Sequence, residues 1–263
     1  MKSIQLLSSL IEKTVFTACI ILLFIGCNKT TETLETMSVS DLVPASKGKF
    51  ITYRVDSLVF DNNTPVTKRY QFKHSFDSLT VDNLNRPMWV VNTFINDSTG
   101  SGPWVPRGQY TITILEKQAE INENNLRVIK VKLPVKENFT WPGNIFLPDK
   151  PYATYGTTIS INLWDFNYES VSRAEKIGPF NLTDVTTITH IDESQGVPVV
   201  DRTKFASQER SLEKYAKGIG MVYREHYVWE NQTNERRDGN PPVTTYNPKY
   251  VGFGIKMWMV ARN

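Results

Sequence analysis

Cysteine and histidine are scarce in this chain of 263 residues, and their scarcity excludes several kinds of site. The two cysteines, Cys19 and Cys27, lie near the N-terminus, so the rest of the chain can form neither an internal disulfide nor a thiolate metal site. Among the three histidines, His190 is followed closely by two more possible ligands, Asp192 and Glu193. Zinc would need at least one more protein ligand. We therefore predict no metal site here and expect a solvated strand end.

An excess of charge of one sign is also missing. The chain has 30 Lys and Arg residues against 27 Asp and Glu residues, a net charge of +3, and the two signs alternate along most of the predicted strands. Because nucleic-acid binding normally requires a basic patch or stripe, the sequence predicts no nucleic-acid partner.

Catalytic and cofactor motifs are absent as well. The sequence contains no Gly-x-Ser-x-Gly turn, no phosphate-binding glycine loop and no dinucleotide fingerprint. We therefore assign no catalytic residue and no cofactor. Scattered carboxylate pairs, such as Asp165 and Glu169, leave a glycosidase open as an alternative, because that chemistry needs two facing carboxyl groups.

Long apolar runs are also lacking. The longest, from Val15 to Ile25, has about a dozen residues and follows Lys2 and Lys13. A helix needs roughly 20 apolar residues to span a bilayer, whereas the shorter length is typical of the apolar part of a signal peptide. We therefore predict an export signal.

A small residue directly before a cysteine closes this run, as Gly26-Cys27, and the arrangement resembles the lipobox of bacterial lipoproteins. The resemblance implies that residues 1–26 are removed as a signal peptide and that Cys27 carries the lipid. The polar, Thr-rich stretch that follows predicts a flexible tether over residues 27–47. Two or three acyl chains hold a protein on a membrane, whereas a single chain binds only marginally.

In the body of the chain, apolar residues recur with a period of two, which is typical of half-buried strands. The clearest run places Tyr70, Phe72, His74 and Phe76 on one face. Many such runs, separated by turn signals, predict an all-β, mainly antiparallel fold. We predict a single β-rich domain over residues 48–263, built as a curled sheet, an open barrel or a sandwich.

The composition of Phe205–Lys217 suits a helix, but its apolar spacing is poor for one. We therefore predict a strand that kinks at Gly218-Ile219-Gly220, where glycines permit a bulge. In the following strand we expect the large apolar side chains to share one side, and these are Ile219, Met221, Tyr223, Tyr227 and Trp229. We expect His226, which shares its face with Arg224, at the surface.

His74 is the most informative polar residue, because it lies between apolar neighbours on a predicted buried face. It is either a core histidine, hydrogen-bonded to a backbone or hydroxyl group, or a polar group in a ligand cavity with Tyr70 and Phe72. Trp104 and Trp141 fall in Gly- and Pro-rich loops, where exposed rings could stack on a carbohydrate. These five residues form the candidate ligand-binding set.

Residues 126–135 (LRVIKVKLPV) run into 139–144 (FTWPGN), and two more characteristic stretches are residues 215–225 (YAKGIGMVYRE) and 252–263. Together they resemble a group of uncharacterised lipoproteins of Bacteroidota. The resemblance covers most of the chain after Cys27. It implies a location in the cell envelope and a β-rich body, and it implies no catalytic residue.

Together these observations predict a lipoprotein of the cell envelope, anchored at the outer membrane, on a face that the sequence does not assign. Its partners would be the membrane, through the lipid, and a protein, glycan or apolar ligand bound without catalysis. A hydrolase of envelope polymers or polysaccharides and a structural envelope component stay open as alternatives. Carboxyl groups facing across a cleft at about 5–9.5 Å would favour the hydrolase. A filled core would favour the structural component.

Overall fold

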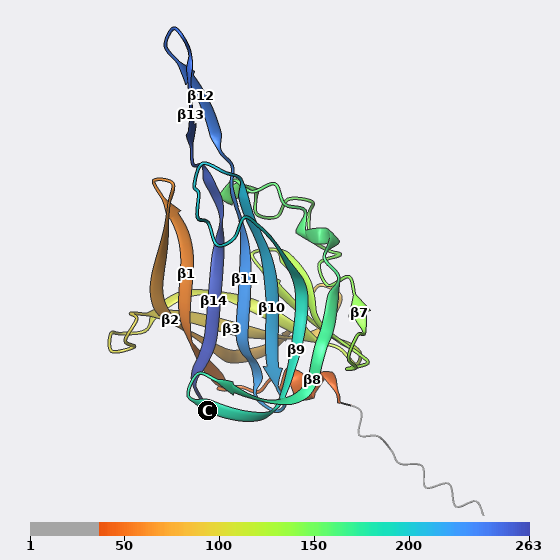
Figure 1. Cartoon of the computed structure of the whole chain (residues 1–263). Coiled ribbons are helices and arrows are strands. Elements are labelled where there is room, and N and C mark those ends of the chain that lie inside the picture. The colour runs from red at the N-terminus through yellow and green to blue at the C-terminus, as the bar shows by residue number, and fades with distance from the viewer. Residues whose placement is uncertain (1–36) are drawn as a thin grey trace, which may run out of the picture. The chain divides into compact units, whose positions relative to one another are not determined.

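The computed structural model describes residues 37–263, so the predicted signal peptide and the predicted acylation of Cys27 lie outside the described residues. The described chain is almost entirely β-structure (Figure 1). Its short helical segments are α2 (Val39–Leu42), η1 (Ala153–Tyr155) and η2 (Ile161–Leu163). Its strands are β1 (Phe50–Asp61), β2 (Thr64–Val81), β3 (Pro87–Asn96), β4 (Val105–Ile114), β5 (Gln118–Glu123), β6 (Leu126–Lys132), β7 (Thr140–Trp141), β8 (Phe166–Ile177), β9 (Phe180–Gln195), β10 (Ala206–Ala216), β11 (Gly220–Asn231), β12 (Asn234–Asp238), β13 (Val243–Asn247) and β14 (Tyr250–Arg262). Within this part of the chain, no helix is long and apolar enough to cross a membrane.

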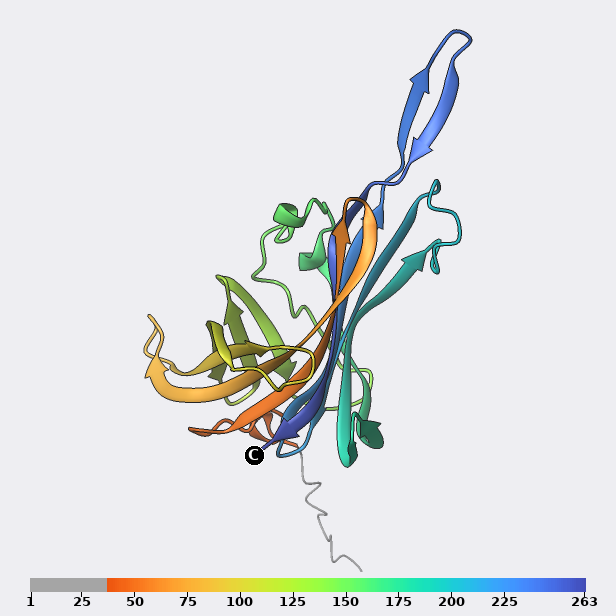
Figure 2. The same ribbon diagram turned by 90° about the vertical axis from the view of Figure 1, so that its left-hand side faces the viewer.

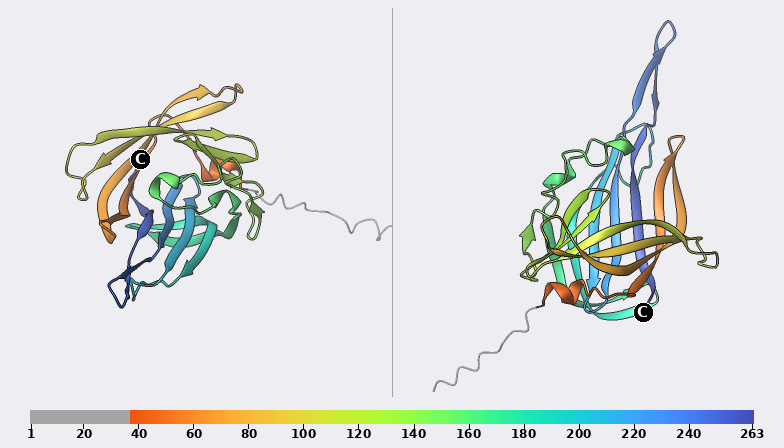
Figure 3. Two further views of the ribbon diagram at one scale, coloured as in Figure 1. Left: turned by 90° about the horizontal axis from the view of Figure 1, so that it is seen from above. Right: turned by 180° about the vertical axis from the view of Figure 1, so that it is seen from behind.

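Twelve strands form one antiparallel sheet in the order β6-β5-β4-β3-β2-β1-β14-β11-β10-β9-β8-β7. The sheet bends so strongly that the half from β2 to β6 leans over the half from β11 to β8 (Figure 2 and Figure 3, left). This confirms the predicted all-β antiparallel fold, in the form of a curled sheet that is nearly closed as a barrel. The remaining strands, β12 and β13, form a separate hairpin that projects from the sheet (Figure 1).

The strands that come first and last in the chain, β1 and β14, lie side by side at the centre of the sheet. β14 pairs with β1 on one side and with β11 on the other. The last residue fastens this junction, because the Phe50 amide donates to Asn263 Oδ1 at 2.8 Å and Asn263 Nδ2 donates to the Gly48 carbonyl at 3.0 Å. β14 is therefore the strand that joins the β1–β6 half to the β7–β11 half.

The two edges of the sheet meet along a seam made largely by side chains. Trp141 Nε1 donates to the carbonyl oxygen of Ile129 at 2.9 Å. The Tyr168 hydroxyl donates to the carbonyl of Lys132 at 2.8 Å and accepts from its amide at 3.3 Å. An uncovered sheet edge exposes unpaired backbone groups that template aggregation. The seam therefore covers β6 and draws the curled sheet towards closure.

Helix α2 packs its apolar side chains into the core ahead of the first strand. Val39 and Leu42 are 2% and 0% exposed. The helix begins at a capping box in which the Asp41 amide donates to Ser38 Oγ at 3.2 Å and the Ser38 amide donates to Asp41 Oδ2 at 2.7 Å. The Gly218 amide then donates to the Asp41 carbonyl at 2.7 Å. The packed domain thus includes residues that the sequence assigned to the tether.

The segment after Phe205 is a strand, as predicted, and it is β10. The glycines after it do not kink a continuing strand. Instead, Lys217, Gly218 and Ile219 form the turn of a hairpin, in which the Ile219 amide donates to the Ala216 carbonyl at 3.0 Å. Gly218 has a φ of +74°, a left-handed conformation that glycine adopts without strain. The chain therefore reverses at this point, and β11 runs back beside β10.

Candidate functional site

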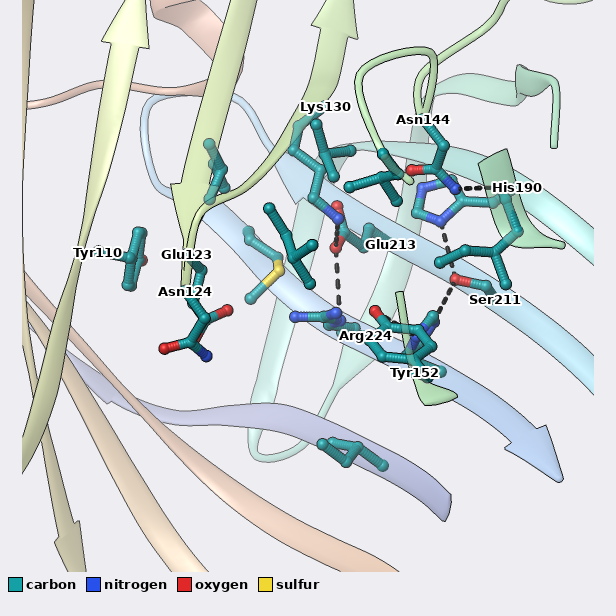
Figure 4. Close-up of a pocket in the computed structure, with 18 of the residues that line it drawn as sticks. Tyr110, Glu123, Asn124, Lys130, Asn144, Tyr152, His190, Ser211, Glu213 and Arg224 are labelled. Carbon is teal, nitrogen blue, oxygen red and sulfur yellow. Dashed lines mark hydrogen bonds and ion pairs between the residues drawn. The ribbon is translucent and has the colours of Figure 1, made fainter. Parts of the chain in front are cut away.

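A cavity of about 220 Å³ lies against the inner surface of the curled sheet. Its mouth is marked by the exposed side chains of Arg107, Asn124 and Tyr155. Its inner end is formed by side chains that are almost completely buried. These are Lys130 from β6, His190 from β9, Ser211 and Glu213 from β10 and His226 from β11 (Figure 4).

Glu213 is the centre of a buried charged cluster. Lys130 Nζ lies 2.7 Å from Glu213 Oε1, and Arg224 Nε lies 3.5 Å from the same oxygen. The Tyr215 hydroxyl donates to Glu213 Oε2 at 2.8 Å. Burial alone would raise the pKa of the Glu213 carboxyl, but the charges of Lys130 and Arg224 hold that pKa well below its ordinary value. Glu213 is therefore an ionised carboxylate that pairs with two cations, Lys130 and Arg224.

A chain of hydrogen bonds links three strands beside this cluster. Ser211 Oγ lies 2.8 Å from His190 Nδ1 and 2.9 Å from His226 Nδ1, and His226 Nε2 lies 3.2 Å from the Tyr152 hydroxyl. Burial lowers the pKa of both histidines well below the ordinary value, so both rings are neutral. His190 stacks on Phe166 with ring centroids 3.6 Å apart. Its Nε2 is buried without a hydrogen-bond partner among residues 37–263.

His74 lies at the junction of this cavity with a smaller one. Its Nδ1 is 3.1 Å from the Tyr110 hydroxyl. Burial, together with the charges of Arg224 and Arg107, lowers the pKa of His74 to about 3. The smaller cavity, of about 60 Å³, extends from this point beneath the chain segment that follows α2, and its walls are mainly apolar. The two cavities share five residues, and these are His74, Tyr110, Ile121, Lys130 and Met221.

The five candidate ligand-binding residues do not form one site. Phe72 and His74 both line the larger cavity. Tyr70 does not line it, and packs against Phe72 with ring centroids 4.9 Å apart. Trp104 lies away from the cavity, with Lys73 Nζ 5.5 Å above its ring.

Trp141 corrects the expectation of an exposed aromatic platform. Only 2% of its surface is exposed, and its indole nitrogen is used in the seam with β6. A ring buried in this way cannot stack on a carbohydrate. Its loop is rich in Gly and Pro because the chain turns sharply there, and the loop covers the sheet edge instead of presenting a surface.

Two surface expectations for histidines are also wrong. His190 and His226 are each 5% exposed and face the cavity. In β11 the inner face carries Arg224 and His226, whereas the aromatic Tyr223 and Tyr227 belong to the other face. The expectation failed because polar side chains occupy the inside of the sheet at this point, and aromatic side chains pack on its outside.

Ser211 lies between two histidines, an arrangement that invites comparison with a catalytic serine. A general base works best when its pKa lies near the operating pH. The pKa values of His190 and His226 are instead held well below the ordinary value by burial. Neither ring is oriented by a carboxylate, since His226 Nε2 meets a tyrosine hydroxyl and His190 Nε2 has no partner in the described chain. The geometry suits binding better than nucleophilic catalysis.

The remaining candidate chemistry gains no support from the geometry. Asp165 and Glu169 are both exposed, and Glu169 accepts a hydrogen bond from Thr189 at 2.5 Å. Within residues 37–263, no group of three or more His, Cys, Asp or Glu side chains is placed to hold a metal ion. Arg210 instead pairs with Asp192 and Glu225 on the sheet.

Comparison with known proteins adds little. No family model and no curated protein matches the chain. An outer membrane lipoprotein-sorting protein domain from Vibrio parahaemolyticus is similar at 10% sequence identity over 82% of this chain and 85% of that one, with a TM-score of 0.16. A likeness at that TM-score carries no argument about function.

Proposed function

We propose that this chain is a lipid-anchored protein of the cell envelope, held at the outer membrane through Cys27, that binds a small ligand inside its curled sheet. The buried charged cluster around Glu213 carries the binding proposal. A buried ion pair is weak evidence for stability, because apolar side chains of similar volume usually serve a core as well or better. A structural component would have a filled interior, whereas this sheet contains a cavity with charged groups at its inner end.

The position of the polar groups favours a small ligand over a protein or glycan partner. Lys130, His190, Ser211 and Glu213 converge inside the sheet. Ligand sites are typically concave and mostly apolar with a few precisely placed polar groups, and aromatic and aliphatic side chains form most of this wall. Hydrolysis is less well supported, because an ionised Glu213 cannot serve as the general acid that a glycosidase needs.

Interior binding can be tested with 1-aminoanthracene, a small uncharged apolar dye whose emission rises in apolar surroundings. The apolar clusters of the described residues all lie within residues 37–263, so we use a chain of residues 28–263, which contains these clusters and lacks Cys27. Val128 lines the cavity, and Val66 lies on the exposed part of β2. We expect Val128→Phe to fill the cavity and weaken dye binding at least tenfold, and Val66→Phe to leave it unchanged. Equal affinity for both variants would refute interior binding.

The anchor needs a separate test on the full chain in cells. Intact mass and membrane fractionation should show acylated wild-type protein in the membrane fraction, and Cys27→Ala should lack the added mass and become soluble. The anchor is wrong if the wild-type sulfur is unmodified or if the native N-terminus lies elsewhere.

A further inference from the structure

The charges around the cavity do not balance. Three cations line it, Arg107, Lys130 and Arg224, against two carboxylates, Glu123 and Glu213. The histidines that line it are neutral because burial disfavours their charged forms. The cavity therefore carries one positive charge more than its own carboxylates neutralise.

Arg224 is the cation with the poorest partner. Glu213 is already engaged by Lys130 at 2.7 Å and by the Tyr215 hydroxyl at 2.8 Å, and Arg224 approaches it only to 3.5 Å. A guanidinium has five N–H donors and does not lose its proton in proteins. A quarter of the Arg224 side chain is accessible, and this residue lines the cavity. Arg224 is thus a fixed positive charge with donors free for an acceptor that enters the cavity.

The second unsatisfied group in the same cavity is His190 Nε2. Ser211 has one hydroxyl proton and two acceptor lone pairs and lies between two histidine Nδ1 atoms, so it donates to at most one of them and otherwise accepts. If Ser211 donates to His190, then His190 Nε2 carries a proton and is a free donor. If Ser211 accepts from His190, then Nε2 is a free acceptor. Either way, a buried polar atom is left without a partner, and such atoms normally have one.

We infer that the ligand is a small amphiphilic monoanion, a carboxylate whose head group pairs with Arg224 and whose apolar body lies along the aromatic wall towards the smaller cavity. This inference rests on the proposed binding function. A carboxylate carries the one negative charge that the cavity lacks, whereas a phosphate monoester would bring close to two. A planar guanidinium also matches a carboxylate with two parallel hydrogen bonds.

The size and lining of the two cavities determine how large the ligand is and what its apolar part can be. A volume of about 220 Å³ is below the roughly 300–1,000 Å³ of sites for drug-sized ligands, so the ligand is small. The smaller cavity meets the larger at His74 and Met221 and is lined by apolar residues such as Ile51 and Ile112. A short acyl chain fits this continuation, because it can enter an apolar branch while its head group stays beside Arg224.

The test compares three probes of equal chain length on residues 28–263 by calorimetry and by displacement of 1-aminoanthracene: octanoate, 1-octanol and octyltrimethylammonium. We expect octanoate to bind at least tenfold more tightly than octanol, and the cation to bind more weakly than both. Arg224→Gln should abolish the preference for octanoate, and Arg224→Lys should retain part of it. The matched control is Arg210→Gln, which removes an arginine that pairs with Glu225 away from the cavity and should keep the full preference.

The possible failures are distinct. Octanol binding as tightly as octanoate, or a folded Arg224→Gln variant that keeps the preference, would overturn the head-group inference while interior binding stands. Binding of 1-aminoanthracene without binding of any octyl probe would also overturn the head-group inference while interior binding stands. Absence of binding by the dye and by all three probes would overturn both this inference and the proposed function. The comparison of octanoate with octanol on the wild-type protein decides the question even if Arg224→Gln does not fold.

Discussion

At the scale of single residues, Glu213 holds the interior together, because it is the acceptor shared by Lys130, Arg224 and Tyr215. A buried charge whose partner is removed loses the attraction that offsets its desolvation.

We therefore expect Glu213→Gln to lower the free energy of unfolding by about 3–5 kcal/mol, measured by urea denaturation, since it leaves Lys130 without its buried counter-charge. Glu137→Gln is the matched control, because Glu137 pairs with Arg173 at 2.8 Å at the surface, where the two side chains are 40% and 66% exposed. Exposed ion pairs contribute little, so the control should show almost no loss. Equal losses in the two variants would contradict the central role of Glu213.

Stability should also depend on pH through the three histidines. Burial is the main cause that lowers the pKa of His74, His190 and His226 in the folded chain, with the value for His74 at about 3. Between that value and the unfolded pKa of 6.5, the unfolded chain binds more protons than the folded one. Stability is therefore fully present above pH 6.5 and falls below it, by up to about 1.4 kcal/mol per pH unit for each histidine.

The measurement is the melting temperature between pH 7.5 and pH 5. This window lies above the range in which Glu213, whose folded pKa is also depressed, would begin to contribute in the same direction. His74→Phe should flatten the slope by about one third, since it removes one of three such groups. A melting temperature that does not change across this window would show that the rings are not buried and neutral.

At the scale of elements, the seam depends on Tyr168, whose hydroxyl satisfies both the amide and the carbonyl of Lys132. Tyr168→Phe keeps the ring and removes both hydrogen bonds. We expect a loss of about 1–3 kcal/mol, since buried backbone groups would be left unpaired. Tyr246→Phe is the control on the exposed hairpin. Amide exchange of β6 should accelerate in the first variant, and unchanged exchange would mean that the seam does not protect this edge.

The strands that the sequence predicts best are those with an apolar inner face. Phe72 and His74 of β2 both face the cavity, and so do Ile255 and Met257 of β14. In these strands the inward-facing side chains are two residues apart, as the pattern assumes.

The candidate site itself could not be predicted in this way. Ser211 and Glu213 in β10, and Arg224 and His226 in β11, are polar residues on the inner face. A rule that places apolar residues inside assigns the wrong face to such strands. The hydrogen-bond and charge partners of these residues come from distant parts of the chain. Lys130, which pairs with Glu213, is 83 residues away from it in the sequence. The alternation of Ser211 with Glu213 and Tyr215 was the available signal, but it identifies an inner face only when the partners are known.

At the scale of the whole molecule, β14 is the joint between two half-sheets. Its buried side chains include Tyr250, Met257 and Met259. A chain that ends at Lys249 should therefore lose cooperative unfolding and become sensitive to protease, because β1 and β11 each lose a neighbour. Deleting Asn234–Asn247, a segment of the same length in which every residue is exposed, should leave the melting temperature nearly unchanged. Cooperative unfolding of the shorter chain would contradict the role of β14.

The pairing of β1 with β14 also determines when, during synthesis of the chain, the sheet can be completed. Strand β1 is made before all the other strands of the sheet, yet its neighbour β14 is finished only when the ribosome reaches Arg262. Until then the two half-sheets have no strand between them, and contacts so distant in sequence form slowly. The sheet therefore cannot close until β14 has left the ribosome. A precursor that is exported while it is being synthesised would cross the membrane before its sheet could close.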